Sequence, residues 1–198
     1  MLSGAGGPTV GYFALAAIPA RYSLERRDWK QAAQLTVRET PFPHTDAITW
    51  FARGLGAARL GQVPAANESA TALKQIREQL SKAAENYWAL QVEIQEVAVR
   101  AWAALAQGKK EEALRQMKSA AELENGTEKS AVTPGPLAPA RELLGEMLLE
   151  MKEPALALEQ FEATLKKEPG AFECSTVRRM LPSSAEIAMR VKDIFASC

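Results

Sequence analysis

The sequence has few of the residues that carry most catalytic and metal chemistry. It contains one histidine, His44, and two cysteines, Cys174 and Cys198, in 198 residues. The cysteines do not have the spacing of a zinc site, and two are too few for a disulfide-rich scaffold. A Ser-His-Asp triad or a His-based metal site would depend on His44 alone, which lies between Pro43 and Thr45 in what we predict to be a solvated turn. We therefore expect no enzymatic activity, no metal and no cofactor.

The chain also lacks a long apolar run and an excess of charge of either sign. No segment reaches the roughly 18 apolar residues needed to span a membrane, and residues 1–8 lack the basic start of a secretory signal. Lysine and arginine together number 24, as do aspartate and glutamate, so no net positive field attracts nucleic acid. We expect neither a nucleic-acid nor a membrane partner, and we interpret the apolar segment 10–20 as a first helix.

Short breaks and alanines recur along the chain. The breaks contain Arg27-Asp28, Gly61–Pro64, Gly108–Lys110 and Lys152–Pro154. Glycine favours a helix C-terminus and proline a first helical turn, so each break predicts the turn of a helical hairpin. An alanine follows each break within five residues: Ala32, Ala66, Ala113 and Ala157. Small residues allow two helix axes to approach closely, and apolar residues at i, i+3 and i+4 predict a shared core. The pattern predicts an all-α fold, an α-solenoid.

Two longer intervals interrupt this regularity in opposite ways. Residues 73–87 are rich in Ala, Lys, Glu and Gln and contain no Gly or Pro, so we expect them to lengthen the flanking helices. Residues 124–138 include Gly126, Pro134, Gly135 and Pro136, which break helices. We expect a long irregular connection there.

The clearest repeat is PARELLGEMLLEMKEPALALEQFEATLKKEP, residues 139–169, in which Gly145, Ala157 and Phe161 occupy the small and large positions of a tetratricopeptide (TPR) unit. The chain resembles the TPR family over about residues 12–169. It is also similar to uncharacterised bacterial TPR-repeat proteins in ALAAIPARYSLERRDW (14–29), AITWFARGLGAARLG (47–61) and TEKSAVTPGPLAPARELLGEMLLE (127–150). The resemblance implies one domain of about four hairpins, at about 10–40, 45–84, 86–124 and 138–168.

The last part of the chain departs from the repeat. Arg178-Arg179 and Pro182-Ser183-Ser184 stand where a small-residue helix is expected, so residues 170–198 are predicted to form an irregular tail with a short helix over 186–195. One hypothesis is that a frameshift of one base altered a fifth repeat. The chain would then be a fragment of a larger protein.

The resemblance implies protein binding on the concave face of the array, which the first helix of each hairpin lines. The predicted contact residues are Arg21, Phe51, Arg59, Trp102, Glu142, Glu146 and Glu150. Trp102 is either an aromatic anchor for the partner or a packing residue against the neighbouring first helix.

Three functions follow from the sequence. The leading one is a non-enzymatic scaffold or adaptor that binds a protein segment. An alternative is a fragment of a larger multi-repeat protein, in which this array is an accessory or dimerisation domain capable of self-association. A third is an enzyme that uses Thr133 or the loop 127–136 as its site.

Overall fold

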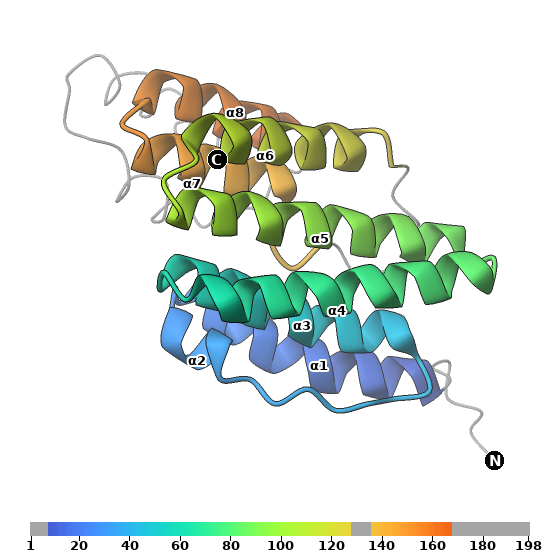
Figure 1. The fold of residues 1–198 in the computed structure, drawn as a ribbon. Coiled ribbons are helices and arrows are strands. Elements are labelled where there is room, and N and C mark those ends of the chain that lie inside the picture. The colour runs from blue at the N-terminus through green and yellow to red at the C-terminus, as the bar shows by residue number, and fades with distance from the viewer. Residues whose placement is uncertain (1–7, 128–135, 168–198) are drawn as a thin grey trace. The chain divides into compact units, whose positions relative to one another are not determined.

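The computed structural model describes residues 8–127 and 136–167, and these residues form helices and no strand (Figure 1). The predicted all-α fold class is confirmed. The chain divides into two compact units, residues 1–138 and 139–198, and each is described by itself. The described helices are α1 (Pro8–Glu25), α2 (Trp29–Ala33), α3 (Pro43–Arg59), α4 (Val63–Lys82), α5 (Asn86–Ala106), α6 (Lys110–Asn125), α7 (Ala140–Glu150) and α8 (Pro154–Lys167).

The first unit is a stack of consecutive helical hairpins. Each first helix packs against the next one, α1 on α3 and α3 on α5, and the second helices pack beside them in chain order. Figure 1 shows this progression from the blue helices to the green ones. The core is therefore shared between neighbouring hairpins, as expected for a helical repeat.

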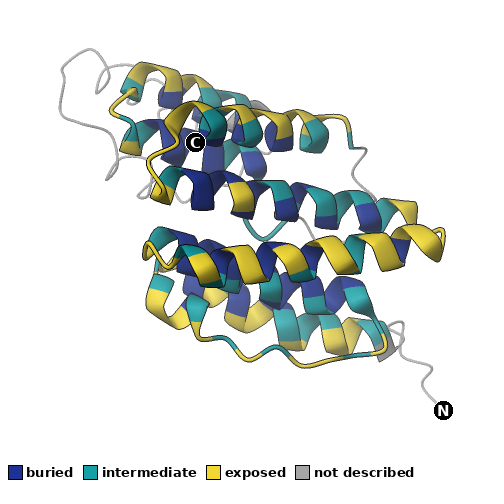
Figure 2. Cartoon of the chain, in the orientation of Figure 1, coloured by how far each residue is buried: buried dark blue, intermediate teal, exposed yellow. Residues whose placement is uncertain are grey.

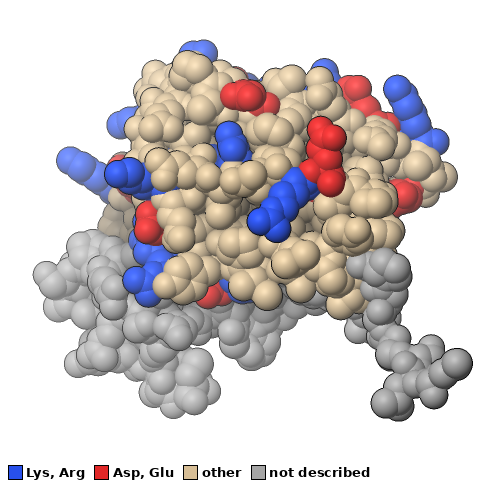
Figure 3. Space-filling model, turned by 90° about the horizontal axis from the view of Figure 1, so that it is seen from below, with Lys and Arg blue, Asp and Glu red and all other residues tan. Residues whose placement is uncertain are grey.

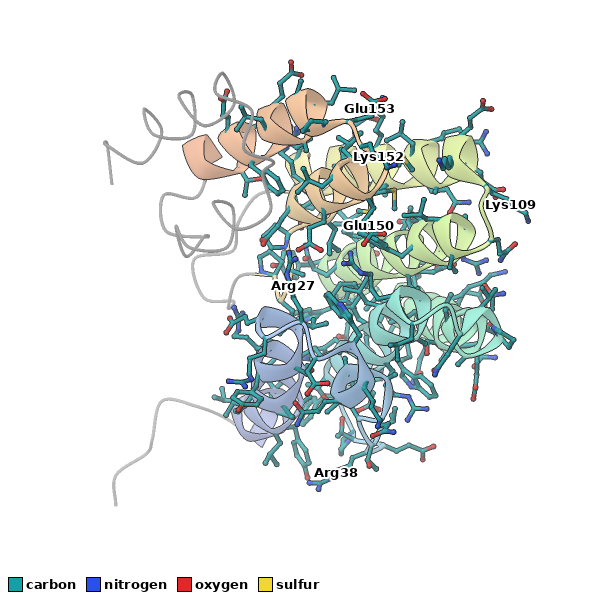
Figure 4. All side chains as sticks on the ribbon, turned by 90° about the vertical axis from the view of Figure 1, so that its left-hand side faces the viewer. Arg27, Arg38, Lys109, Glu150, Lys152 and Glu153 are labelled. Carbon is teal, nitrogen blue, oxygen red and sulfur yellow. The ribbon has the colours of Figure 1, made fainter. Side chains whose placement is uncertain are left out.

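The four predicted breaks coincide with the turns between α1 and α2, α3 and α4, α5 and α6, and α7 and α8. After α3 and α5 the turn uses a left-handed glycine, Gly61 (φ 73°) or Gly108 (φ 78°). After α1 and α7, Arg27 (φ 56°) and Lys152 (φ 66°) adopt the same conformation without glycine (Figure 4). The residue after each of these four donates its amide to the carbonyl five residues earlier, for example Gln62 to Ala57 at 2.8 Å. This is the bond of a Schellman motif, which ends a helix by satisfying its last carbonyls.

The recurring alanines lie at the helix crossings, as predicted. Ala32, Ala66, Ala113 and Ala157 are completely buried. Gly54 is equally close packed, because a Cβ atom added to it would lie 2.7 Å from Val99 Cγ1. Small residues are therefore required at these positions by the approach of two helices.

The region between residues 73 and 87 also follows the prediction. It extends α4 to 20 residues and α5 to 21, with a short turn between them. In the connection after α6, Gly126, Thr127 and residues 136–139 are non-helical, and residues 128–135 lie outside the described part. The predicted tail, with its short helix at 186–195, also lies outside the described residues.

The second helix of the first hairpin is much shorter than a TPR unit implies. α2 contains five residues, and residues 34–42 run on without helix to Pro43. Proline disfavours the helical conformation of the residue before it, so Pro41 and Pro43 favour an extended chain here. Arg53 Nη1 donates to the Leu35 carbonyl at 2.7 Å and holds the start of the segment against α3.

The second unit contributes the hairpin of α7 and α8. Phe161 on α8 is buried, and its ring lies against Gly145 on α7, where an added Cβ atom would come within 2.5 Å of Phe161 Cε1. Arg141 Nη1 donates to Gln160 Oε1 at 2.9 Å and joins the two helices at their edge. The small and large residues of the repeat thus meet as complementary shapes.

Candidate interaction surface

Helix α1 carries two apolar stripes on nearly opposite faces. The inner stripe contains Phe13, Ala17, Ala20 and Leu24, spaced by four, three and four residues, and the last three are buried. A stripe with this spacing forms one face of a helix, and α1 packs on α3. The inner stripe therefore anchors α1 to the rest of the first unit.

Among the described residues, none covers the outer stripe in this way. Leu15, Ile18 and Tyr22 are 63%, 68% and 52% exposed, and Gly11, four residues before Leu15, continues this stripe toward the start of the helix. Figure 2 shows exposed segments along the helices at the N-terminal end of the stack. Residues 8–20 contain no charged side chain. Figure 3, seen from below Figure 1, shows a surface on which Lys, Arg, Asp and Glu side chains are few and scattered. Contiguous exposed apolar side chains on a folded protein indicate an interaction site.

The predicted concave-face residues of the first unit differ in their burial and in their contacts. Phe51 and Trp102 are each only 2% exposed, so neither presents a side chain to a partner. Arg59 lies half-buried, with its Cζ 4.6 Å from the ring centroid of Trp29 and 4.2 Å from that of Trp102. The structure brings Arg59 and Trp102 together, but as an internal cation–π contact between neighbouring first helices. Arg21 is half-exposed and forms an ion pair of 3.5 Å with Glu25.

The three predicted carboxylates belong to the second unit and lie on α7. Glu142 is half-buried, Glu146 is buried, and Glu150 is exposed at the end of the helix (Figure 4). They share one helical face because they are spaced by four residues. The partner-binding role of all seven residues stays a prediction, and the burial of Phe51 and Trp102 argues against those two.

His44 lies in a row of aromatic rings, and the prediction of a solvated turn is wrong for it. It is 7% exposed in the first turn of α3, and its ring stacks on Trp88 of α5 with a centroid distance of 4.2 Å. The centroid of the Phe42 ring lies 6.2 Å from that of His44. Neither ring nitrogen has a hydrogen-bond partner in the part of the chain that the structure describes. Pro43, which suggested a turn, is instead the first residue of a helix, a position that proline favours.

This burial predicts a pH-dependent stability. Desolvation lowers the pKa of His44, while the charges of Glu85 and Asp46 oppose the shift. The unfolded chain therefore binds a proton more readily than the folded one. The stability that the neutral His44 ring contributes is fully present above about pH 6.5 and is lost as pH falls toward the folded pKa. We expect the melting temperature to fall between about pH 7 and pH 5. The slope from this group is at most about 1.4 kcal/mol per pH unit.

The control is His44→Phe, which keeps a ring against Trp88 and cannot titrate. Its melting temperature should fall less over the same pH range than that of the unaltered chain. An equal fall in melting temperature with pH for the two proteins would show that His44 does not cause the pH dependence of stability.

A group of ion pairs joins α4 to α5. Arg77 contacts Glu93 at 3.2 Å and Glu96 at 3.4 Å, and Arg100 contacts Glu96 at 3.0 Å. Beside it lies an open cleft of about 500 Å³ lined by Arg77, Glu78, Ser81, Lys82, Asn86, Ala89, Leu90 and Glu93. The lining contains two basic and two acidic side chains, and Arg77 is already paired. The cleft therefore has no net charge that would attract an ionic ligand, and the cluster links the two helices.

Within residues 8–127 and 136–167, no three side chains of His, Cys, Asp or Glu are grouped as a metal site would need. No helix in these ranges combines the length and apolarity of a membrane span. Thr133, the candidate of the enzyme hypothesis, lies outside them. No protein family, curated protein or solved structure matches the chain.

Sequence reasoning identified the helix at residues 10–20 but not its outer stripe. The signal was present, because Leu15, Ile18 and Tyr22 recur at helical spacing. A second stripe at Ala17, Ala20 and Leu24 has the same spacing, and the sequence alone does not say which stripe is buried.

Proposed function

We propose that the chain is a non-catalytic, TPR-like protein-binding module whose contact surface includes the outer stripe of α1. The observation that carries this proposal is the exposure of Leu15, Ile18 and Tyr22 on a helix that is anchored by its opposite face. A partner that covers them removes apolar area from water, and because the stripe lies on a formed helix, no loop-ordering entropy is added to the translational and rotational cost of association.

The composition of α1 favours a protein as the partner. Nucleic acid is bound chiefly through Lys and Arg contacts to phosphate, and surface-bound membrane helices place such residues beside their apolar face. Residues 8–20 contain none of them, Arg21 pairs with Glu25 at 3.5 Å, and Arg26 lies with its Cζ 5.1 Å from the centroid of the Tyr22 ring. An uncharged stripe of aliphatic and aromatic side chains instead has the composition of the core of a protein interface.

This proposal keeps the scaffold or adaptor function and moves its contact surface from the groove to α1. The alternative, an accessory or dimerisation domain of a larger multi-repeat protein, is favoured by the same feature. In a helical repeat each first helix packs against another first helix, and the described residues cover only one apolar face of α1.

The test is photo-crosslinking from the stripe in cells of the source organism. The photoreactive residue p-benzoylphenylalanine replaces Tyr22, and the matched control carries it at Glu68, an exposed position on α4. We expect a protein adduct from position 22 that is absent from position 68, and we expect Ile18→Glu to abolish it. Failure to form any adduct at position 22, or an adduct with lipid alone, would overturn the proposal.

A further inference from the structure

We propose that the partner of the outer stripe is a second copy of this chain, and that two α1 helices pair antiparallel about a twofold axis. This inference rests on the proposed function, because it names the protein that covers the stripe. It follows from the spacing of the stripe, the open space above Gly11 and the charges of α1.

The first step is the spacing. Gly11, Leu15, Ile18 and Tyr22 are separated by four, three and four residues, which is the a/d spacing of a coiled-coil seam. All four are exposed. Such a seam is suited to pairing with another helix along its length, rather than to holding a single side chain.

The second step is the shape of the seam. Gly11 has open space above it, since no heavy atom lies within 4 Å of the position of a Cβ atom there. Tyr22, at the other end, projects a large ring that is 52% exposed. The stripe therefore has a gap at one end and a bulky residue at the other.

An antiparallel pair makes these ends complementary. With the twofold axis between residues 16 and 17, Leu15 lies opposite Ile18 of the second copy, and Tyr22 lies opposite the glycine gap. A parallel pair would instead place the two tyrosines together and the two gaps together, which packs poorly at both ends. In a twofold dimer the same surface is used by both copies, so one stripe must be complementary to itself. The sequence of this stripe meets that condition only in the antiparallel direction.

The charges of α1 permit the same arrangement. Its only charged residues are Arg21 and Glu25, which pair with each other at 3.5 Å, so α1 is neutral overall. In the antiparallel register Arg21 lies level with residues 10–14 of the second copy, which contain no charged side chain. No like charges face each other across the axis.

The contact is small, and we expect a weak dimer. A single helix pair lies at the low end of the sizes of specific interfaces, so we expect a dissociation constant of roughly 10–100 µM. Analytical ultracentrifugation across this range should show the average mass rising from monomer to dimer. Ile18→Glu should raise the dissociation constant at least about tenfold, because it places two carboxylates near the axis.

The matched control is Leu60→Glu. Leu60 is another exposed apolar side chain, 43% exposed, but it lies at the end of α3 and outside the stripe. The same change there should leave the dissociation constant within about twofold, and both variants should keep the helical circular dichroism spectrum of the parent. A mass that stays monomeric at all concentrations, or equal weakening by both variants, would overturn the proposal.

Disulfide trapping tests the direction of pairing. In a background with Cys174→Ser and Cys198→Ser, chains with Gly11→Cys are mixed with chains with Tyr22→Cys under oxidising conditions. Antiparallel pairing predicts the mixed disulfide and no Gly11→Cys homodimer, since the two positions 11 would lie about 16 Å apart along the axis. Homodimers from each variant alone, without the mixed product, would overturn the antiparallel arrangement.

The two proposals fail in different ways. A photo-adduct of position 22 with a different protein, from a chain that stays monomeric, leaves protein binding intact and overturns self-pairing. The absence of both adduct and dimer overturns both. An adduct with twice the mass of the chain supports both.

Discussion

Replacing Trp102 by alanine is expected to lower the free energy of unfolding of the first unit by about 3–5 kcal/mol. Trp102 is among the largest side chains that are almost fully buried, and its removal leaves a cavity that its neighbours fill only in part. The change also removes one of the two rings that hold the Arg59 guanidinium, whose Cζ lies 4.2 Å from the Trp102 centroid. Chemical denaturation followed by circular dichroism measures the loss.

The control for this prediction is Trp102→Phe. Phenylalanine keeps an aromatic ring near Arg59 and removes an indole N–H that has no hydrogen-bond partner among the described residues. We expect it to cost about 1–2 kcal/mol, clearly less than alanine.

The result also decides between the two roles that the sequence allowed for Trp102. A Trp102→Ala chain that keeps its stability within about 1 kcal/mol but loses a partner would restore the concave-face anchor. A large loss of stability supports packing between first helices, and it means that a binding defect in this variant would follow from unfolding.

The features that the sequence predicted correctly are those set by local geometry. A left-handed residue at the end of a helix and an alanine at a helix crossing are needed wherever two helices meet in a tight hairpin, so Gly61, Gly108, Ala66 and Ala113 mark the turns and contacts directly. The lengths of α4 and α5 were also predicted correctly, because residues 73–87 contain no Gly or Pro to break a helix.

The features that it missed depend on which neighbour covers a helix face. Phe51 and Trp102 have the spacing expected of a groove, but an apolar face that lines a groove and one that packs on the next first helix have the same pattern. His44 followed two prolines, and only the structure shows that Pro43 begins α3 and directs the imidazole toward Trp88. The short α2 was also missed, because the repeat template implies a full second helix.

The second large effect is expected at Gly56, where replacement by alanine should lower the free energy of unfolding by about 1–3 kcal/mol. An added Cβ atom would lie 2.7 Å from the Ala33 nitrogen and 2.7 Å from the Trp29 carbonyl oxygen. Both are backbone atoms of α2, so no side-chain rotation relieves the contact, and α2 must move away from α3. Alanine normally stabilises a helix relative to glycine by about 0.5–1 kcal/mol, and here the steric cost must exceed that gain.

The matched control is the same substitution at Gly11. It lies in the first turn of α1, and its Cβ position has no neighbour within 4 Å, so only the gain in helix propensity remains. Measured below the concentration at which the chain associates, Gly11→Ala should stabilise the protein by about 0.5–1 kcal/mol. A loss of stability for Gly56→Ala together with a gain for Gly11→Ala would confirm that α2 packs directly on the α3 backbone. Stabilisation by both would mean that α2 does not hold this position, because only a displaced α2 leaves room for the methyl group at Gly56.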